Sequence, residues 1–365
     1  MLSPMAVSPG ETIVGFRAIY WRGVVCASFV FAALLAGTAA AEDARFFRIG
    51  TAATAGSFFE IGGILATAIS SPPGTPACGQ GGNCGVPGLV AVAQTTQGSV
   101  DNLKLINSGQ IESGFAQADL AGWAYAGSNI FNETGPMPRL RAIASLFPEA
   151  LHLVVRSESP IHSVPDLAGK TVALGEPGSG TSANARVLLA TMKLGETDLT
   201  RKNLSPGQAA AALQAGAIDA FFVAGAPPIP AIRELATSTP IRLVPIEPEI
   251  VRKLEKEFPF YHASASAGDT YPGITGDTPT AGFFALWLAG AGIDSDLVYA
   301  ITKSLWSEAT GRLMAALPAG QRIDLDRALA GLSVPLHPGA ERFYREAGRP
   351  VDDTPQVKEV EDKSK

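Results

Sequence analysis

Short apolar runs of β type alternate with helical segments along most of this chain, and loops of small residues join them. The first such unit has a strand at 46–50, a loop at 51–57 and a helix at 58–69. A later unit repeats the order, with a strand at 170–175, a loop at 176–181 and a helix at 182–194. Because a strand, a tight loop and a helix form the repeating unit of parallel sheets, the pattern predicts an α/β fold.

The rest of the chain extends this pattern. Further strands are predicted at 89–94, 111–117, 140–146, 151–156 and 217–224. Further helices are predicted at 99–108, 208–215 and 229–236, and towards the C-terminus at 281–291, 295–317 and 336–347. The final segment, 350–365, is charged and has no apolar face, so we expect it to be disordered.

The N-terminal segment 1–41 is interpreted as a secretory signal peptide. Arg17 and Arg22 precede an apolar run at 23–37, and small residues ending at Ala41 offer a cleavage site. A transmembrane anchor is the alternative, but the run is shorter than the roughly twenty residues that span a bilayer. We therefore expect the mature chain to be periplasmic, with cleavage near Ala41.

Cys78 and Cys84 lie in a loop that is rich in glycine and proline. In an oxidising compartment such a pair is expected to form a disulfide. Free thiols are the alternative. A metal site is disfavoured, because no histidine lies near the pair to complete a set of ligands.

Charge and motif content exclude several classes of function. The chain has 28 basic and 34 acidic residues, a net charge of -6 and no basic block, so nucleic acid is not an expected partner. No G-x-S-x-G motif occurs, and none of the histidines has metal-ligand spacing. Gly178-x-Gly180-x-x-Ala183 is similar to a dinucleotide fingerprint, but the acids that would bind the ribose follow a helix instead of a strand. We expect no metal and no cofactor.

The loops 51–57 and 176–181 are candidate ligand-binding elements. Each combines small residues with hydroxyl side chains and leads into a helix. Glycines at 178 and 180 let backbone N–H groups converge, and the helix dipole adds positive potential, so the loops favour an anion such as a carboxylate. For a single loop of this kind, a plain turn capped by Ser or Thr is the favoured interpretation. Two such loops favour a ligand that lies between them.

Several segments, in order, are similar to the motifs of one known family. They are I-G-T at 49–51 with T-x-G-S-F-F at 54–59, T-x-x-G-S-V-x-N-L at 95–103, G-x-x-Q-x-D at 114–119, G-S-G-T at 178–181, Y-P-G at 271–273 and P-L-H-P-G-A at 335–340 with Tyr344. The set resembles the TAXI-type solute receptors of tripartite ATP-independent periplasmic (TRAP) transporters. The resemblance covers nearly the whole mature chain.

The resemblance implies a type II periplasmic binding protein fold, in which two α/β lobes with parallel or mixed sheets close on a ligand about a hinge. Lobe I would comprise 42–147 and 271–349, and lobe II would comprise 148–270. Members bind small organic acids, such as glutamate-like amino acids, dicarboxylates or keto acids, and deliver them to the subunits of a TRAP permease. The resemblance implies neither catalysis nor a cofactor, and we expect a monomer.

Residues that match the family's motifs by position are the predicted ligand-binding residues. They are Thr51, Thr54, Gly56, Ser57, Phe58, Gln117, Gly178, Ser179, Gly180, Thr181, Ala224, Gly225 and Tyr271. Phe58 and Phe59 stand where the family often has tyrosines, and Ala55 replaces a usual glycine. These departures predict a ligand that is less polar or differently shaped.

Two other functions are compatible with the same sequence. An exported binding protein that serves a membrane sensor would share all of these features. An exported enzyme on the same fold would need a general base, for which Asp119 and Glu60 are the candidates.

Overall fold

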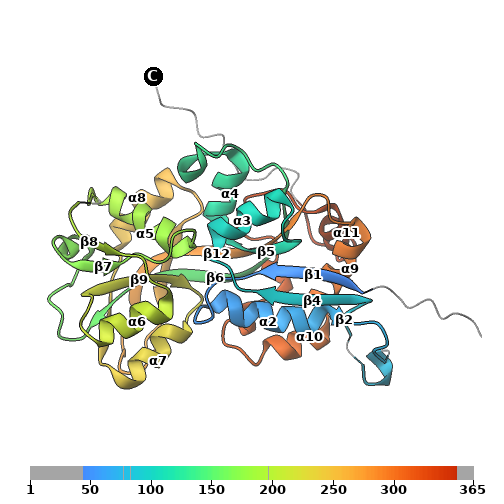
Figure 1. Ribbon diagram of the computed structural model, residues 1–365, viewed down its shortest axis with the longest axis horizontal. Coiled ribbons are helices and arrows are strands. Elements are labelled where there is room, and N and C mark those ends of the chain that lie inside the picture. Colours follow the sequence, from blue (N-terminus) through green and yellow to red (C-terminus); the bar gives the residue numbers. More distant parts are fainter. Residues whose placement is uncertain (1–43, 77, 83, 196, 352–365) are drawn as a thin grey trace, which may run out of the picture. The chain divides into compact units, whose positions relative to one another are not determined.

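The computed structural model describes residues 44–76, 78–82, 84–195 and 197–351 (Figure 1). The predicted signal peptide lies outside these ranges, as does the predicted disordered tail from residue 352 onward. Within the described ranges, every helix is too short or too polar to span a membrane.

The first βα units form one half of a mixed sheet. Strand β1 (Arg45–Gly50) pairs in parallel with β4 (Leu89–Gln94) on one side and with β5 (Ser113–Gln117) on the other. Helix α2 (Ser57–Ile69) covers one face and α3 (Ser99–Ser108) the opposite face (Figure 1). Two short strands, β2 (Ser70–Ser71) and β3 (Val86–Pro87), extend the edge beyond β4. These elements agree with the sequence prediction.

Two long antiparallel strands form the centre of the sheet. Strand β6 (Leu140–Arg156) replaces the two separate strands predicted at 140–146 and 151–156. Strand β12 (Thr278–Gly290) lies between β5 and β6, so the helix predicted at 281–291 is wrong. A strand that is buried on both faces is apolar throughout, and such a run cannot be distinguished from a buried helix by its periodicity.

The second half of the sheet pairs with the C-terminal part of β6, residues 150–156. Strand β7 (Thr171–Ala173) pairs in parallel with β8 (Thr200–Lys202) and with β9 (Ala220–Gly225), and β9 pairs with β6. Strand β10 (Ile241–Val244) pairs with the end of β6, and β11 (His262–Ser266) pairs with the start of β12. The helices of this half are α5 (Gly180–Thr191), α6 (Pro206–Gln214), α7 (Pro230–Ser238) and α8 (Pro248–Glu257).

Both halves have the same strand order. In the first half the strands lie in the order β4-β1-β5-β12-β6. The first strand of this half, β1, lies between the second (β4) and the third (β5), and the crossover strand β12 separates the third from the fourth (β6). In the second half, β8-β7-β9-β6-β10 follows the same order, with β6 as the crossover strand. The mixed sheet with flanking helices confirms the predicted α/β fold. The two parts share one continuous sheet instead of two separate sheets, because β6 and β12 run through both.

The C-terminal helices cover the face of the first half that carries α2. Helices α9 (Ser295–Leu305) and α10 (Glu308–Met314) replace the single helix predicted at 295–317. The first helix ends at its C-cap Trp306, and the Ser307 side chain caps the second. Helix α11 (Pro338–Glu346) agrees with its prediction, whereas α4 (Ala118–Ala126) was not predicted. In the loop between β2 and β3, Cys78 and Cys84 are joined by a disulfide, with 4.6 Å between their Cα atoms, as predicted.

Candidate functional site

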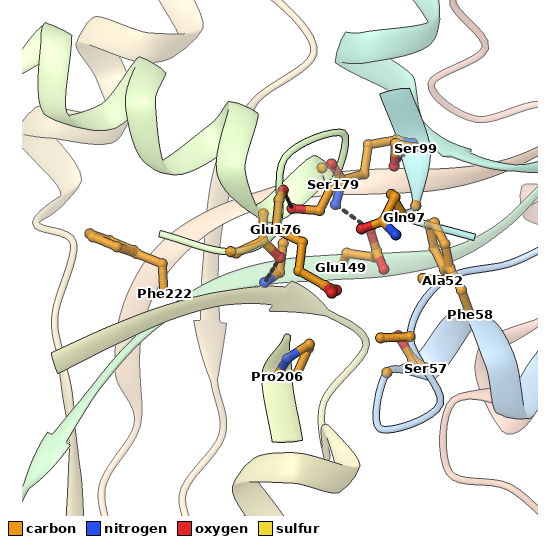
Figure 2. Close-up of a pocket in the computed structure, with 18 of the residues that line it drawn as sticks. Ala52, Ser57, Phe58, Gln97, Ser99, Glu149, Glu176, Ser179, Pro206 and Phe222 are labelled. Carbon is orange, nitrogen blue, oxygen red and sulfur yellow. Dashed lines mark hydrogen bonds between the residues drawn. The ribbon is translucent and has the colours of Figure 1, made fainter. Parts of the chain in front are cut away.

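A pocket lies where the loops of the two sheet halves meet (Figure 2). The first half contributes the loop before α2, the start of α3, the end of β5 and the middle of β6. The second half contributes the loop before α5, the start of α6 and the end of β9. The cavity measures about 50 Å³, so this form leaves little space between the two halves.

Most of the predicted ligand-binding residues line this pocket. They are Gly56, Ser57, Phe58, Gln117, Ser179, Gly180, Thr181 and Ala224. The candidate loops 51–57 and 176–181 therefore face the same cavity, although they are far apart in the sequence.

The other predicted residues, Thr51, Thr54, Gly178, Gly225 and Tyr271, lie outside the pocket lining. Thr51 is buried, and its hydroxyl donates to the Gln94 carbonyl over 2.8 Å. The buried Tyr271 hydroxyl accepts the Ile229 N–H over 3.0 Å. In this form of the protein both hydroxyls therefore bond within the interior and do not reach the pocket lining, so a ligand-binding role for Thr51 and Tyr271 stays a prediction.

Hydrogen bonds join the two halves beside the pocket. The Gly178 carbonyl accepts the N–H groups of Val100 and Asp101 over 3.0 and 3.2 Å. These donors lie in the first turn of α3, where a helix offers N–H groups that have no partner within the helix. The Ser57 hydroxyl accepts the Ala226 N–H over 3.1 Å. The two halves are therefore in direct contact in this form of the protein.

The hydroxyls of the second loop have different roles. Ser179 caps α5: its Oγ accepts the Ser182 N–H over 3.1 Å and donates to the Glu176 carbonyl over 2.7 Å. Ser179 therefore has the capping role expected of a plain capped turn, the alternative that the sequence left open. Thr181 instead accepts the Ala224 N–H over 3.0 Å. That bond orients the hydroxyl and leaves its hydrogen available for a ligand, as the bond from Ala226 does for Ser57.

Gln117 and Gly180 touch across the pocket. A Cβ atom at position 180 would overlap the Gln117 amide, so any larger residue there requires that side chain to move. The amide in turn donates from Nε2 to the Glu149 carboxyl oxygen Oε2 over 3.0 Å. The geometry of this part of the pocket therefore depends on a glycine in one half and a glutamine in the other.

Glu149 is a pocket residue that the sequence analysis missed. It lies in the middle of β6 and is 2% exposed, and burial raises its pKa to about 8. The Coulombic effect of nearby Asp119 raises the pKa further, while the bond from Gln117 opposes the shift. The signal that could have identified it is a single acid inside a long apolar run, since buried acids are rare unless they have a partner.

The candidate general bases do not lie in the pocket lining. Asp119 is fully buried, its Oδ2 accepts the Asn184 amide over 2.6 Å, and burial raises its pKa to about 6. Glu60 lies on α2, also outside the lining. Neither residue is therefore placed to transfer a proton to a molecule bound in this pocket. Among the described residues, no cluster of three or more His, Cys, Asp or Glu side chains could hold a metal ion.

The chain matches one known family and is similar to several solved structures. Residues 49–348 match the sequence profile of the NMT1-like family. The chain is similar to the alkanesulfonate-binding protein SsuA from Xanthomonas axonopodis pv. citri bound to MOPS. The two sequences are 19% identical, the alignment covers 86% of this chain and 89% of that chain, and the TM-score is 0.47. It is also similar to the periplasmic aliphatic sulphonate binding protein SsuA from Escherichia coli, with 18% identity, 84% and 94% covered, and a TM-score of 0.39.

Proposed function

The chain belongs to the NMT1-like family, and from that premise we propose that it is a periplasmic solute receptor that binds a small organic acid between the two halves of its sheet. The observation that carries the proposal is a pocket whose lining comes from both halves. Ligand sites in open α/β sheets lie at the ends of parallel strands, which is where these loops are found.

Two hydroxyls, one from each half, are proposed to hold the ligand's carboxylate. Ser57 and Thr181 each lie at the start of a helix, α2 or α5, and each has its oxygen oriented by a backbone N–H. Helix N-termini favour anions. Hydrogen bonds to a charged group contribute about 1.5–3 kcal/mol each. Several such bonds, less the cost of ordering the ligand, support an affinity near the micromolar range, about 8 kcal/mol.

Closure of two lobes is the proposed mechanism. Lobe I would contain 42–147 and 271–349, lobe II would contain 148–270, and β6 and β12 would form the hinge. A ligand that touches both lobes favours the closed form through its additional contacts. The bonds from α3 to Gly178 and from Ala226 to Ser57 would belong to that closed form.

Delivery to a TRAP permease is the finer part of the proposal, and it rests on the ordered TAXI-like motifs in the sequence. A receptor for a membrane sensor is the alternative. The genes next to this one distinguish the two: a neighbouring gene for a large multi-span permease supports transport, and a neighbouring sensor kinase gene supports signalling.

Replacing Ser57 and Thr181 together by alanine is expected to weaken binding of the organic acid by about tenfold or more, because one carboxylate donor is lost from each half. We expect a stability cost of about 1–2 kcal/mol, since the N–H groups of Ala224 and Ala226 lose their acceptors. The ligand is first chosen by melting temperature from L-glutamate, succinate, 2-oxoglutarate and L-alanine, and the affinity is then measured by calorimetry.

The control is Thr181→Ser, which retains the hydroxyl and should bind within about threefold of the wild type. An unchanged affinity in the double variant would contradict the proposed carboxylate site. The function itself fails if no acid of the panel, and no acid released from the purified protein, raises the melting temperature.

A further inference from the structure

The inner wall of the pocket carries a buried carboxyl group and a buried amide oxygen. Glu149 and Gln117 are 2% and 3% exposed, and both line the pocket. The Gln117 Nε2 donates to Glu149, and the Oε1 of the same amide lies beside Gly180. Among the described residues that buried oxygen has no hydrogen-bond partner. The Gln117 oxygen thus lacks a donor among the described residues, and the Glu149 carboxyl receives its hydrogen bond from the Gln117 amide.

The charged residues of the described pocket lining are all acidic. The described residues that line the pocket include two acids, Glu149 and Glu176, but neither lysine nor arginine. A buried carboxylate without a cation is unfavourable, and it binds either a proton or a positively charged group. A dicarboxylate would bring further negative charge towards Glu149, whereas an ammonium group would neutralise it.

We propose that Glu149 and Gln117 form a subsite for a positively charged nitrogen, so that the ligand is a zwitterion such as an α-amino acid instead of a dicarboxylate or keto acid. The inference rests on the proposed function, in which Ser57 and Thr181 bind the ligand's carboxylate. The ammonium group then donates to the Glu149 carboxylate and to the Gln117 Oε1. Donors and acceptors on different walls of the pocket thereby select both charges of the ligand.

The pH dependence of binding follows from this arrangement. In the empty pocket burial raises the pKa of Glu149 to about 8, so the group carries a proton at neutral pH. An ammonium ligand replaces that proton, and its affinity therefore rises between pH 6 and pH 8.5. A purely anionic ligand needs the protonated form, and its affinity falls over the same range.

Other titratable groups near Glu149 must be separated from this effect. Asp119 on α4 interacts with it electrostatically, and Glu176 before α5 lines the same pocket. Phe58 of α2 and Phe283, the β12 residue opposite Glu149, do not titrate. A pH response that disappears in Glu149→Gln therefore belongs to Glu149.

The test compares acids that differ only in the amino group. Calorimetry at pH 6 and pH 8.5 measures the binding of L-glutamate against glutarate, and of L-alanine against propionate. The wild type should prefer the amino member by about tenfold or more, and Glu149→Gln should remove most of that preference and its rise with pH. Glu60→Gln, an acid on α2 outside the pocket lining, is the control and should retain both.

Stability separates a binding role from a structural one. The folded-state pKa of Glu149 lies above its ordinary value, so the wild type loses stability as the pH rises from about 4.5 through about 8. Glu149→Gln lacks this loss and should melt at a higher temperature than the wild type at pH 8.5. A residue that only supported the fold would instead lower the melting temperature when replaced.

The outcomes distinguish the two proposals. If glutarate or propionate binds the wild type as tightly as its amino counterpart, or if Glu149→Gln keeps the preference, the nitrogen subsite is wrong and the receptor function stands. If no member of either pair binds, and the protein releases no other small acid on denaturation, the receptor function and the subsite both fail.

Discussion

Replacing Gly180 by alanine is expected to weaken ligand binding by about 100-fold, or about 2.7 kcal/mol. The new Cβ atom would overlap the Gln117 amide. That side chain would have to move, lose its 3.0 Å bond to Glu149 and fill part of a cavity of about 50 Å³. The affinity is measured by calorimetry with the acid that stabilises the wild type most.

The fold should tolerate this substitution, because Gly180 begins α5 with a backbone conformation that alanine adopts. The matched control is Gly63→Ala on α2, where a Cβ meets no atom within 4 Å. It should leave binding unchanged and increase stability by about 0.5–1 kcal/mol, because alanine favours the helix. Full affinity in Gly180→Ala would mean that Gln117 does not shape the site.

Replacing Trp287 by alanine is expected to lower the free energy of unfolding by about 3–5 kcal/mol. Trp287 is fully buried in β12, the crossover strand between β5 and β6, and packs edge-to-face on Phe115 with 6.3 Å between ring centroids. Removing it leaves a large cavity at the centre of the sheet. Urea unfolding followed by circular dichroism measures the change.

Phe46→Ala is the control for this experiment. Phe46 is also an aromatic residue of a sheet strand, but it is 68% exposed, so its replacement should change stability by less than about 0.5 kcal/mol. A loss of less than about 1 kcal/mol in Trp287→Ala would contradict the central position of β12 in the hydrophobic core.

The sequence predicted the βα units well, because their signals are local. The strand at β1, the helix α3 closed by Gly109 in a left-handed conformation, and the loop before α5 are each encoded by neighbouring residues. It failed at β12, where every residue is apolar or small because neighbouring strands and helices cover both faces. Which faces are covered depends on distant parts of the chain, so local periodicity could not distinguish that strand from a helix.

The candidate site was predictable in part for the same reason. Small residues and hydroxyls at strand ends identified the loops that contain Ser57 and Thr181, and both line the pocket. Thr51 and Tyr271 matched motifs of the family, yet their hydroxyls bond inside the core. For Glu149 the local signal was a single acid inside an apolar run, but its contact with Gln117, a residue on another strand, has no local signal.

A crystal structure of the protein, grown with the acid that raises its melting temperature most, tests the central claim directly. We expect density for that acid in the pocket, with its carboxylate within hydrogen-bond distance of the hydroxyls of Ser57 and Thr181, so that residues of both sheet halves hold one molecule. Density at another place, or a ligand held by only one half, would contradict the account.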